Sequence, residues 1–222
     1  MRVEWYGQSA FHLVGGQASV AIDPFGEMPG LAGRGVQFEY APISGVQAQL
    51  VLVTHEHADH NGVEAIGGDP AILRSTAGRL DSPIGPITAI SSEHDERAGT
   101  ERGPNTIFAF ELDGLRVCHF GDFGQSELRG EQAAAIGDVD LLFIPVGGGP
   151  TIGAAQATEI VQRLAPRWAV PMHYRTPRIG FLETAEEFLE RSANVELLQG
   201  SAFDTAELPL ADGPLVVVPA AP

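Results

Sequence analysis

The chain has 222 residues, of which 44% are hydrophobic, so it is long and apolar enough for one large domain with a continuous core. Its 29 acidic and 13 basic residues give a formal net charge of −16, which repels polyanions and excludes nucleic acid as an expected partner. All 13 basic residues are arginine, which excludes reactions that need a lysine Schiff base.

The sequence has no apolar run near the roughly 20 residues that a membrane span needs, and its N-terminus has no apolar signal core. The single cysteine, Cys118, cannot form an internal disulfide, which suits a reducing compartment. We therefore expect a cytoplasmic protein without a membrane partner. The sequence leaves open whether the chain forms homo-oligomers.

The first third of the chain predicts a sheet. Residues 2–6, 10–14 and 17–22 read as strands, because glycines interrupt the apolar pattern between them. Residues 26–45 lack periodicity, and we expect a long loop that reaches over the site. Together with a second loop at 95–104, it is expected to select the substrate.

A buried strand is predicted at residues 49–53, which are rich in branched apolar side chains. Directly after it come His55, Glu56, His57, Asp59 and His60. So dense a set of imidazoles and carboxylates indicates a metal site. The alternative, a solvated polar loop that happens to be rich in histidine, is disfavoured by this density. A helical zinc-protease motif is excluded, because it would need histidine at position 59.

The rest of the chain predicts further strands and two helices. An Asp113-Gly114 turn joins strands at 105–112 and 115–120, and this hairpin would deliver Asp122 at its end. Helices are expected at 154–164 and 184–192, with Thr151 and Thr184 near their starts as candidate caps. The other expected strands cover residues 87–90, 139–144, 168–171, 195–199 and 215–218.

The His-x-His-x-Asp-His pattern after an apolar strand resembles the signature of the metallo-β-lactamase fold superfamily. His94, Asp122 and His173 follow in the order of that superfamily's later ligands. The segments around Asp23-Pro24 and at 143–153 are similar to the small UlaG-like metal-dependent hydrolases. The resemblance implies an α/β (α+β) fold in which residues 1–222 form a single αββα sandwich domain.

By resemblance, the site binds two divalent transition metals per chain, with zinc favoured and manganese, iron or nickel left open. Seven residues would hold them: His55, His57 and His94 the first ion, Asp59, His60 and His173 the second, with Asp122 bridging both. A hydroxide between the metals would be the nucleophile. Asp122 and Asp59 would be the catalytic carboxylates, and Asp59 could accept a proton from the bridging water.

Four further residues are candidates for support or substrate contact. His119 is expected to orient a ligand or line the pocket, with a core histidine as the alternative. Asp23 is expected to partner a ligating histidine, against a simple turn before Pro24. Relatives carry Gly-His-Ser where this chain has Gly7, Gln8 and Ser9. If that histidine supports the site in relatives, Gln8 must support it differently or not at all. Arg175 could meet a substrate carboxylate or phosphate, or be a solvated arginine.

The resemblance therefore implies a dinuclear metal-dependent hydrolase that acts on a small, anionic ester, lactone or phosphodiester. An iron-dependent oxidoreductase or oxygenase on the same fold is the alternative. Flavodiiron members usually carry glutamate where this chain has His57, which argues against that alternative. A site kept for metal binding without turnover is a third reading, disfavoured because the ligand set is complete.

Overall fold

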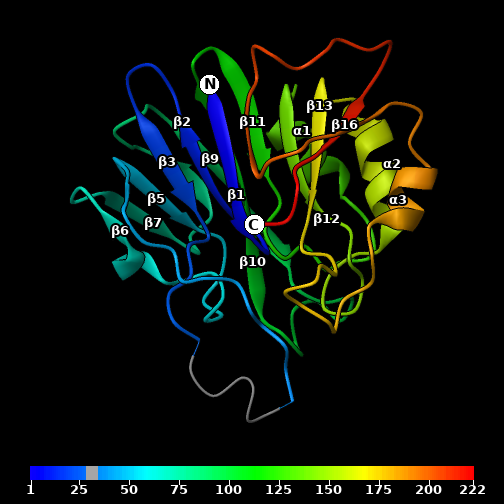
Figure 1. Cartoon of the computed structure of the whole chain (residues 1–222), viewed down its shortest axis with the longest axis horizontal. Coiled ribbons are helices and arrows are strands. Elements are labelled where there is room, and N and C mark those ends of the chain that lie inside the picture. Colours follow the sequence, from blue (N-terminus) through cyan, green and yellow to red (C-terminus); the bar gives the residue numbers. More distant parts are fainter. Residues whose placement is uncertain (29–34) are drawn as a thin grey trace.

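The computed structural model describes residues 1–28 and 35–222, which form two β-sheets packed face to face (Figure 1). The six-stranded sheet has the order β15 (Ala202–Asp204), β1 (Arg2–Gly7), β2 (Ala10–Val14), β3 (Ser19–Ile22), β5 (Leu50–Val53) and β7 (Ala71–Arg74). The eight-stranded sheet has the order β14 (Val195–Leu197), β16 (Leu215–Val218), β13 (Trp168–Met172), β12 (Leu141–Pro145), β11 (Leu115–His119), β10 (Pro104–Leu112), β9 (Ile87–Glu93) and β8 (Gly78–Leu80). Two short strands, β4 (Val46–Gln47) and β6 (Ile66–Gly67), pair separately, and a 3₁₀ turn covers Val63–Ala65.

The main core lies between the two sheets, because alternate side chains of a strand point to opposite faces. In β5, Leu50 and Leu52 join this core, whereas Val51 and Val53 belong to a second cluster on the other face. All four residues of the strand are fully buried. The continuous apolar run thus marks a strand covered on both sides, as the sequence predicted.

The two sheets have different outer covers. Three helices, α1 (Gly130–Ile136), α2 (Ala154–Leu164) and α3 (Glu186–Glu190), accompany the eight-stranded sheet, with α2 and α3 beside it at the right of Figure 1. On the six-stranded sheet, the second cluster is closed by loop side chains such as Phe25, Tyr40 and Ile43. The predicted α/β fold class is confirmed, with paired sheets at the centre.

The predicted caps are wrong, although one helix has the predicted bounds. Helix α2 covers Ala154–Leu164, as predicted, and begins after Gly153. The hydroxyl of Thr151 does not cap it but contacts the carbonyl oxygens of Gly148 and Ile152 at 3.5 and 3.4 Å. Helix α3 is shorter than predicted and has no side-chain cap. Thr184 is not its cap, because its hydroxyl bonds the Glu186 carboxylate at 3.3 Å.

The long loop predicted at 26–45 contains residues 29–34, which lie outside the described residues. Its described part folds back onto the protein, where Phe38 forms a β-bridge with Ile179 and Tyr40 bonds Thr176 at 2.7 Å. The loop is thereby tied to the segment that follows His173. Among residues 1–28 and 35–222, no helix is long and apolar enough to cross a membrane.

Candidate metal centre

The predicted ligands lie at the ends of four strands. The loop after β5 carries His55, His57, Asp59 and His60, while His94, Asp122 and His173 follow β9, β11 and β13 respectively. Strands β11, β12 and β13 are parallel, and β9 and β11 both run antiparallel to β10. Strands β9, β11 and β13 therefore run in the same direction and end at the same edge of their sheet. The loop that follows β5 in the other sheet lies next to this edge. All seven predicted ligands meet at this edge.

The Oδ2 atom of Asp122 is the centre of the cluster. It lies 3.1 Å from Nε2 of His173 and 3.3 Å from Nε2 of both His60 and His94. Nε2 of His55 is 3.9 Å away. All five side chains are buried. A carboxylate oxygen surrounded by four imidazole nitrogens is the arrangement expected of a bridging ligand.

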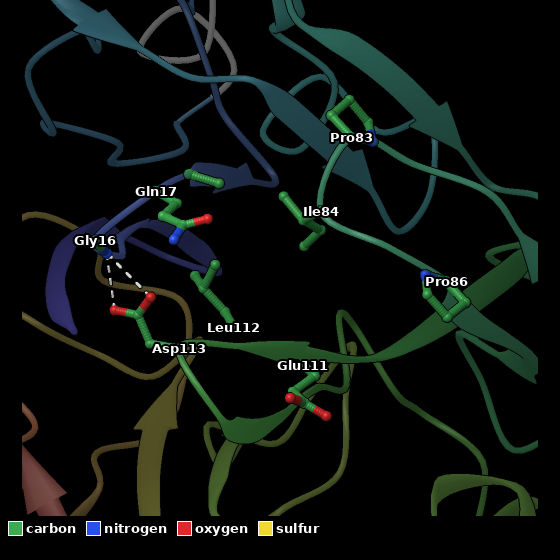
Figure 2. A pocket seen from close by; sticks show the side chains of 9 residues that line it. Gly16, Gln17, Pro83, Ile84, Pro86, Glu111, Leu112 and Asp113 are labelled. Carbon is green, nitrogen blue, oxygen red and sulfur yellow. Dashed lines mark hydrogen bonds between the residues drawn. The ribbon is translucent and has the colours of Figure 1, made fainter.

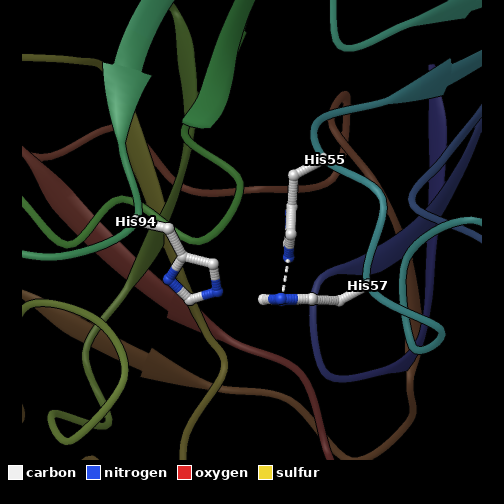
Figure 3. Close-up of side chains that lie close together, drawn as sticks. All are labelled: His55, His57 and His94. Carbon is white, nitrogen blue, oxygen red and sulfur yellow. Dashed lines mark hydrogen bonds between the residues drawn. The ribbon is translucent and has the colours of Figure 1, made fainter. Parts of the chain in front are cut away.

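The ligand atoms form three groups, of which the central one, His55, His60 and Asp122, shares one histidine with each of the other two. His55, His57 and His94 form one, and Nε2 of His55 lies 3.0 Å from Nδ1 of His57 (Figure 3). Asp59, His60 and His173 form the other, in which Oδ2 of Asp59 is 3.6 Å from Nε2 of His60. His57 is exposed and Asp59 is partly exposed, so these two residues mark the solvent side of the cluster.

The buried carboxylate of Asp23 fixes the protonation of two histidines. Its Oδ2 accepts hydrogen bonds from the Thr54 hydroxyl at 2.7 Å and from Nδ1 of His60 at 3.0 Å. An ionised carboxylate only accepts, so Nδ1 of His60 carries the proton. The Thr54 hydroxyl gives its one hydrogen to Asp23 and therefore accepts from Nδ1 of His55, 3.1 Å away. In the neutral form of either ring, the lone pair is then on Nε2.

The same logic holds for His94, whose Nδ1 lies 3.0 Å from the Pro150 carbonyl oxygen and must donate to it. Its Nε2 lone pair, like that of His60, then faces the acceptor-only oxygen of Asp122. Nε2 of His60 is buried and has no hydrogen-bond partner among the described residues. Acceptors that face one another in a buried site need a proton or a metal cation between them. The donor set therefore fits transition metals that take imidazole and carboxylate ligands.

Electrostatics support this reading. Burial disfavours the charged form of His60, but the carboxylates of Asp122, Asp59 and Asp23 outweigh it and raise its pKa well above the usual value. Burial likewise opposes ionisation of Asp122, yet His173 and His60 hold the pKa of its carboxyl well below the usual value. For His55, burial and the neighbouring His60 charge lower the pKa. The cluster thus favours an ionised Asp122 carboxylate next to a positive charge.

The other predicted residues have varied positions. His119 is buried, with Nε2 bonded to the Ser9 carbonyl at 3.0 Å and Nδ1 accepting from the Gly121 amide at 3.1 Å. Both of its nitrogens are engaged, so it links two turns rather than offering a ligand atom. Gln8 donates to Asp59 at 3.3 Å. Arg175 is exposed, and its Nε donates to the Leu182 carbonyl at 2.5 Å.

Sequence reasoning missed four polar residues that support the cluster. The Thr54 hydroxyl donates to Asp23 and accepts from Nδ1 of His55, as described above. Ser9 donates to Oδ1 of Asp122 at 3.1 Å, and Asn105 accepts from the Asp122 amide at 3.0 Å. Asp95, next to His94, accepts from the backbone amides of Arg97, Gly99, Glu101 and Arg102 and so shapes the 95–104 loop. Thr54 and Asp95 had a sequence signal, namely adjacency to a ligand, and Ser9 is the serine of the segment that relatives carry as Gly-His-Ser.

The cavity in Figure 2 lies elsewhere in the fold. It measures about 800 Å³ and is lined in part by Gly16, Ile84, Leu112 and Asp113. The amide of Gly16 donates to both carboxylate oxygens of Asp113 at 3.0 Å. Asp113 precedes β11 and Asp122 follows it, so the cavity is at the opposite end of this strand from the histidine cluster. None of its lining residues belongs to the cluster.

Comparison with known proteins agrees with the geometry. Residues 2–173 match the family described as the beta-lactamase superfamily domain. A UPF0173 metal-dependent hydrolase of Thermococcus kodakarensis is 30% identical over 207 residues, covering 79% of this chain and 85% of the relative. One from Thermus thermophilus is 30% identical, covering 94% and 98%.

The solved structures include a Thermotoga maritima protein assigned to the Zn-dependent hydrolases of the metallo-β-lactamase superfamily. It is 27% identical to this chain, covers 99% of both chains and superposes with a TM-score of 0.76. The fold thus recurs over nearly the whole length of a solved relative. The chain belongs to the metallo-β-lactamase superfamily and, within it, to the UPF0173 metal-dependent hydrolases.

Proposed function

We propose that residues 1–222 form one UlaG-like metallo-β-lactamase domain that hydrolyses a small ester, lactone or phosphodiester at a dinuclear centre, with zinc as the favoured metal. We assign His55, His57 and His94 to the first ion and Asp59, His60 and His173 to the second, because each trio forms one group of closely spaced ligand atoms. Asp122 would bridge the ions, because it groups with one histidine of each trio, His55 and His60.

One observation carries the proposal. The Oδ2 atom of Asp122 is 3.3 Å from Nε2 of both His60 and His94, whose Nδ1 protons are committed to Asp23 and to the Pro150 carbonyl. Two lone pairs thus point at a carboxylate oxygen from different elements of the fold. A site arranged in this way favours cations, because a carboxylate and neutral imidazoles supply the ligand atoms together.

When bound, divalent metals lower the pKa of water and polarise the oxygen of the bond to be cleaved. The protein's own residues would supply the remaining functions. Asp59 is partly exposed and only 3.6 Å from His60, so it is suited to accept a proton from the attacking water. Asp122 is buried and bonded to Ser9, which suits a fixed structural charge rather than a mobile proton carrier.

The substrate would enter from the side marked by His57 and Asp59. A small molecule is favoured, because the net charge of −16 opposes binding of nucleic acid. Arg175, exposed and two residues after His173, supports an anionic substrate. The cytoplasmic location stays a prediction from the sequence.

Metal content tests the proposal directly. The protein is purified without chelator or added metal, and each transition metal is measured per chain. Near two zinc or manganese ions per chain would support the dinuclear hydrolase and justify assays with lactones, esters and phosphodiesters. Predominant iron would favour the oxidoreductase or oxygenase instead, and no metal even after reconstitution would refute the ligand assignment.

Variants test the roles of the ligands. We expect His57→Ala or Asp122→Ala to abolish hydrolysis while the circular dichroism spectrum stays unchanged. His12→Ala is the matched control, because this histidine lies in β2 and belongs to none of the metal-ligand groups among the described residues. Full activity in Asp122→Ala would contradict the proposed centre.

A further inference from the structure

The turn between β1 and β2, residues Gly7, Gln8 and Ser9, contacts three of the proposed ligands. The side-chain amide of Gln8 donates to Oδ2 of Asp59 at 3.3 Å, and the backbone carbonyl of Gln8 accepts from the amide of His173 at 3.3 Å. The hydroxyl of Ser9 donates to Oδ1 of Asp122 at 3.1 Å. Two of these ligands, Asp59 and His173, belong to the second metal group, and Asp122 is the bridge.

The contacts are selective. Among residues 1–28 and 35–222, no hydrogen bond joins this turn to His55, His57 or His94, which form the first metal group. His55 is held instead by the Thr54 hydroxyl and His94 by the Pro150 carbonyl, as described above. Asp23 supports both groups, through Thr54 and through His60, whereas the turn contacts only the second group and the bridge.

The turn is held in one conformation by its surroundings. Gly7 has φ +108°, and a Cβ atom placed there would lie 2.5 Å from the ring of Tyr40, so glycine is required. Gln8 has φ +48°, which is rare for a residue with a side chain. Its carbonyl also accepts from the indole Nε1 of Trp5 at 3.0 Å. A strained conformation fixed by its neighbours is typical of functional positions.

The orientation of the Gln8 amide follows from its partner. The Asp59 carboxylate is the acceptor of the 3.3 Å bond, so the NH₂ group of Gln8 faces it. The Oε1 atom of Gln8 is buried without a hydrogen-bond partner among the described residues. The fully buried side chain thus leaves one polar atom unpaired while it bonds Asp59, which favours a positioning role over a packing role.

We infer that the β1–β2 turn sets the affinity of the second metal position, with Gln8 and Ser9 as positioning residues that act through Asp59 and Asp122. The inference rests on the proposed function, because it assumes that the two groups of ligands bind two ions. It separates the positions, since loss of the Gln8 contact to Asp59 should weaken the second ion and leave the first, whereas loss of the Ser9 contact to the bridging Asp122 should affect both.

The test is a metal titration of the whole chain with Zn²⁺ and, for its absorption spectrum, with Co²⁺. Gln8→Met keeps the length of the side chain and removes the donor, and Ser9→Ala removes only a hydroxyl. Gln132→Met is the matched control, because Gln132 is a buried glutamine in α1 that bonds Gln125, the Arg129 amide and the Ser91 carbonyl instead of a ligand. Unfolding temperatures of the apoproteins check that each variant folds.

We expect the affinity for the second equivalent to fall by about 10- to 100-fold in Gln8→Met and in Ser9→Ala, the loss typical of groups that orient metal ligands. In Gln8→Met, the first equivalent and its Co²⁺ spectrum should match the unsubstituted protein, whereas Ser9→Ala should also weaken the first equivalent, because Asp122 would bind both ions. Unchanged second affinity in both variants would overturn the inference and leave the proposed function intact. Equal weakening of both equivalents in Gln8→Met, or the same loss in Gln132→Met, would also overturn it. A protein that binds no metal before substitution would refute the proposed function itself.

Discussion

Asp23 and His60, both fully buried, are joined by a 3.0 Å hydrogen bond between Oδ2 and Nδ1. Asp23 follows β3 and His60 follows β5, and these strands are parallel neighbours. The backbone amide of Thr54 donates to the other oxygen of Asp23 at 2.7 Å. One carboxylate therefore orients a ligand and anchors the start of the loop that carries four of them.

Asp23→Asn is expected to weaken metal binding by about 10- to 100-fold, because an amide cannot accept on both sides. Its NH₂ group would have to face either the Thr54 amide or Nδ1–H of His60, which leaves two donors opposed. Isothermal titration calorimetry with Zn²⁺ measures the loss of affinity. Undiminished affinity in a folded Asp23→Asn protein would mean that the bond to His60 does not orient the ligand.

Asn105→Ala is expected to destabilise the protein by about 1–3 kcal/mol, because it leaves buried polar groups unpaired. Asn105 accepts from the Asp122 amide at 3.0 Å and donates to the Phe120 carbonyl at 2.8 Å. Denaturant unfolding measures the change. Asn194→Ala is the control, since Asn194 is only half-buried and its two contacts are 3.4 Å long. A loss no larger than that of the control would be evidence against a structural role for Asn105.

Arg74→Ala is expected to change stability by less than about 1 kcal/mol, because exposed ion pairs contribute little. Arg74 bonds the Glu56 carboxylate through Nε at 3.2 Å, but both side chains are exposed. Asn61 still donates to the Glu56 carbonyl at 3.0 Å, so metal content should be retained. Arg167→Ala, at another exposed pair, is the control. Loss of metal from Arg74→Ala alone would show that the pair holds the ligand loop.

The three tyrosines predict a loss of stability in alkali. Burial and the nearby Glu4 raise the pKa of Tyr6 from 10.0 to about 12, and burial also raises the pKa of Tyr40 and of Tyr174. The unfolded chain therefore ionises first, so stability present below pH 10 is lost as the pH rises towards 12. Denaturant unfolding at a series of pH values measures this, and Tyr6→Phe should reduce the slope. Phenolate absorbance that appears at pH 10 in the folded protein would contradict the raised values.

The sequence predicted most of the strands and the chemistry of the site. The buried strand at 49–53 and the metal-binding loop after it were predicted from residues that are neighbours in the sequence, so no structure was needed. The bounds of α2 agree with the prediction, but α3 is shorter than predicted and the helix caps were less predictable. Thr151 and Thr184 have the chemistry of caps, yet their hydroxyls found other partners in the folded chain. Helix α1 and strands β7, β8 and β15 were not predicted, because weak local patterns there are stabilised by tertiary contacts.

By itself the sequence determined which side chains are available as metal ligands. Four of them lie within six residues of one loop and three follow predicted strands, and both patterns can be recognised from spacing along the chain. Only the tertiary structure decided how they are held. Ser9, Asn105 and Asp23 are distant from their partners along the chain, and strand order brings them together. The tertiary structure also assigned His119 to a link between turns, since a histidine's role depends on what faces each nitrogen.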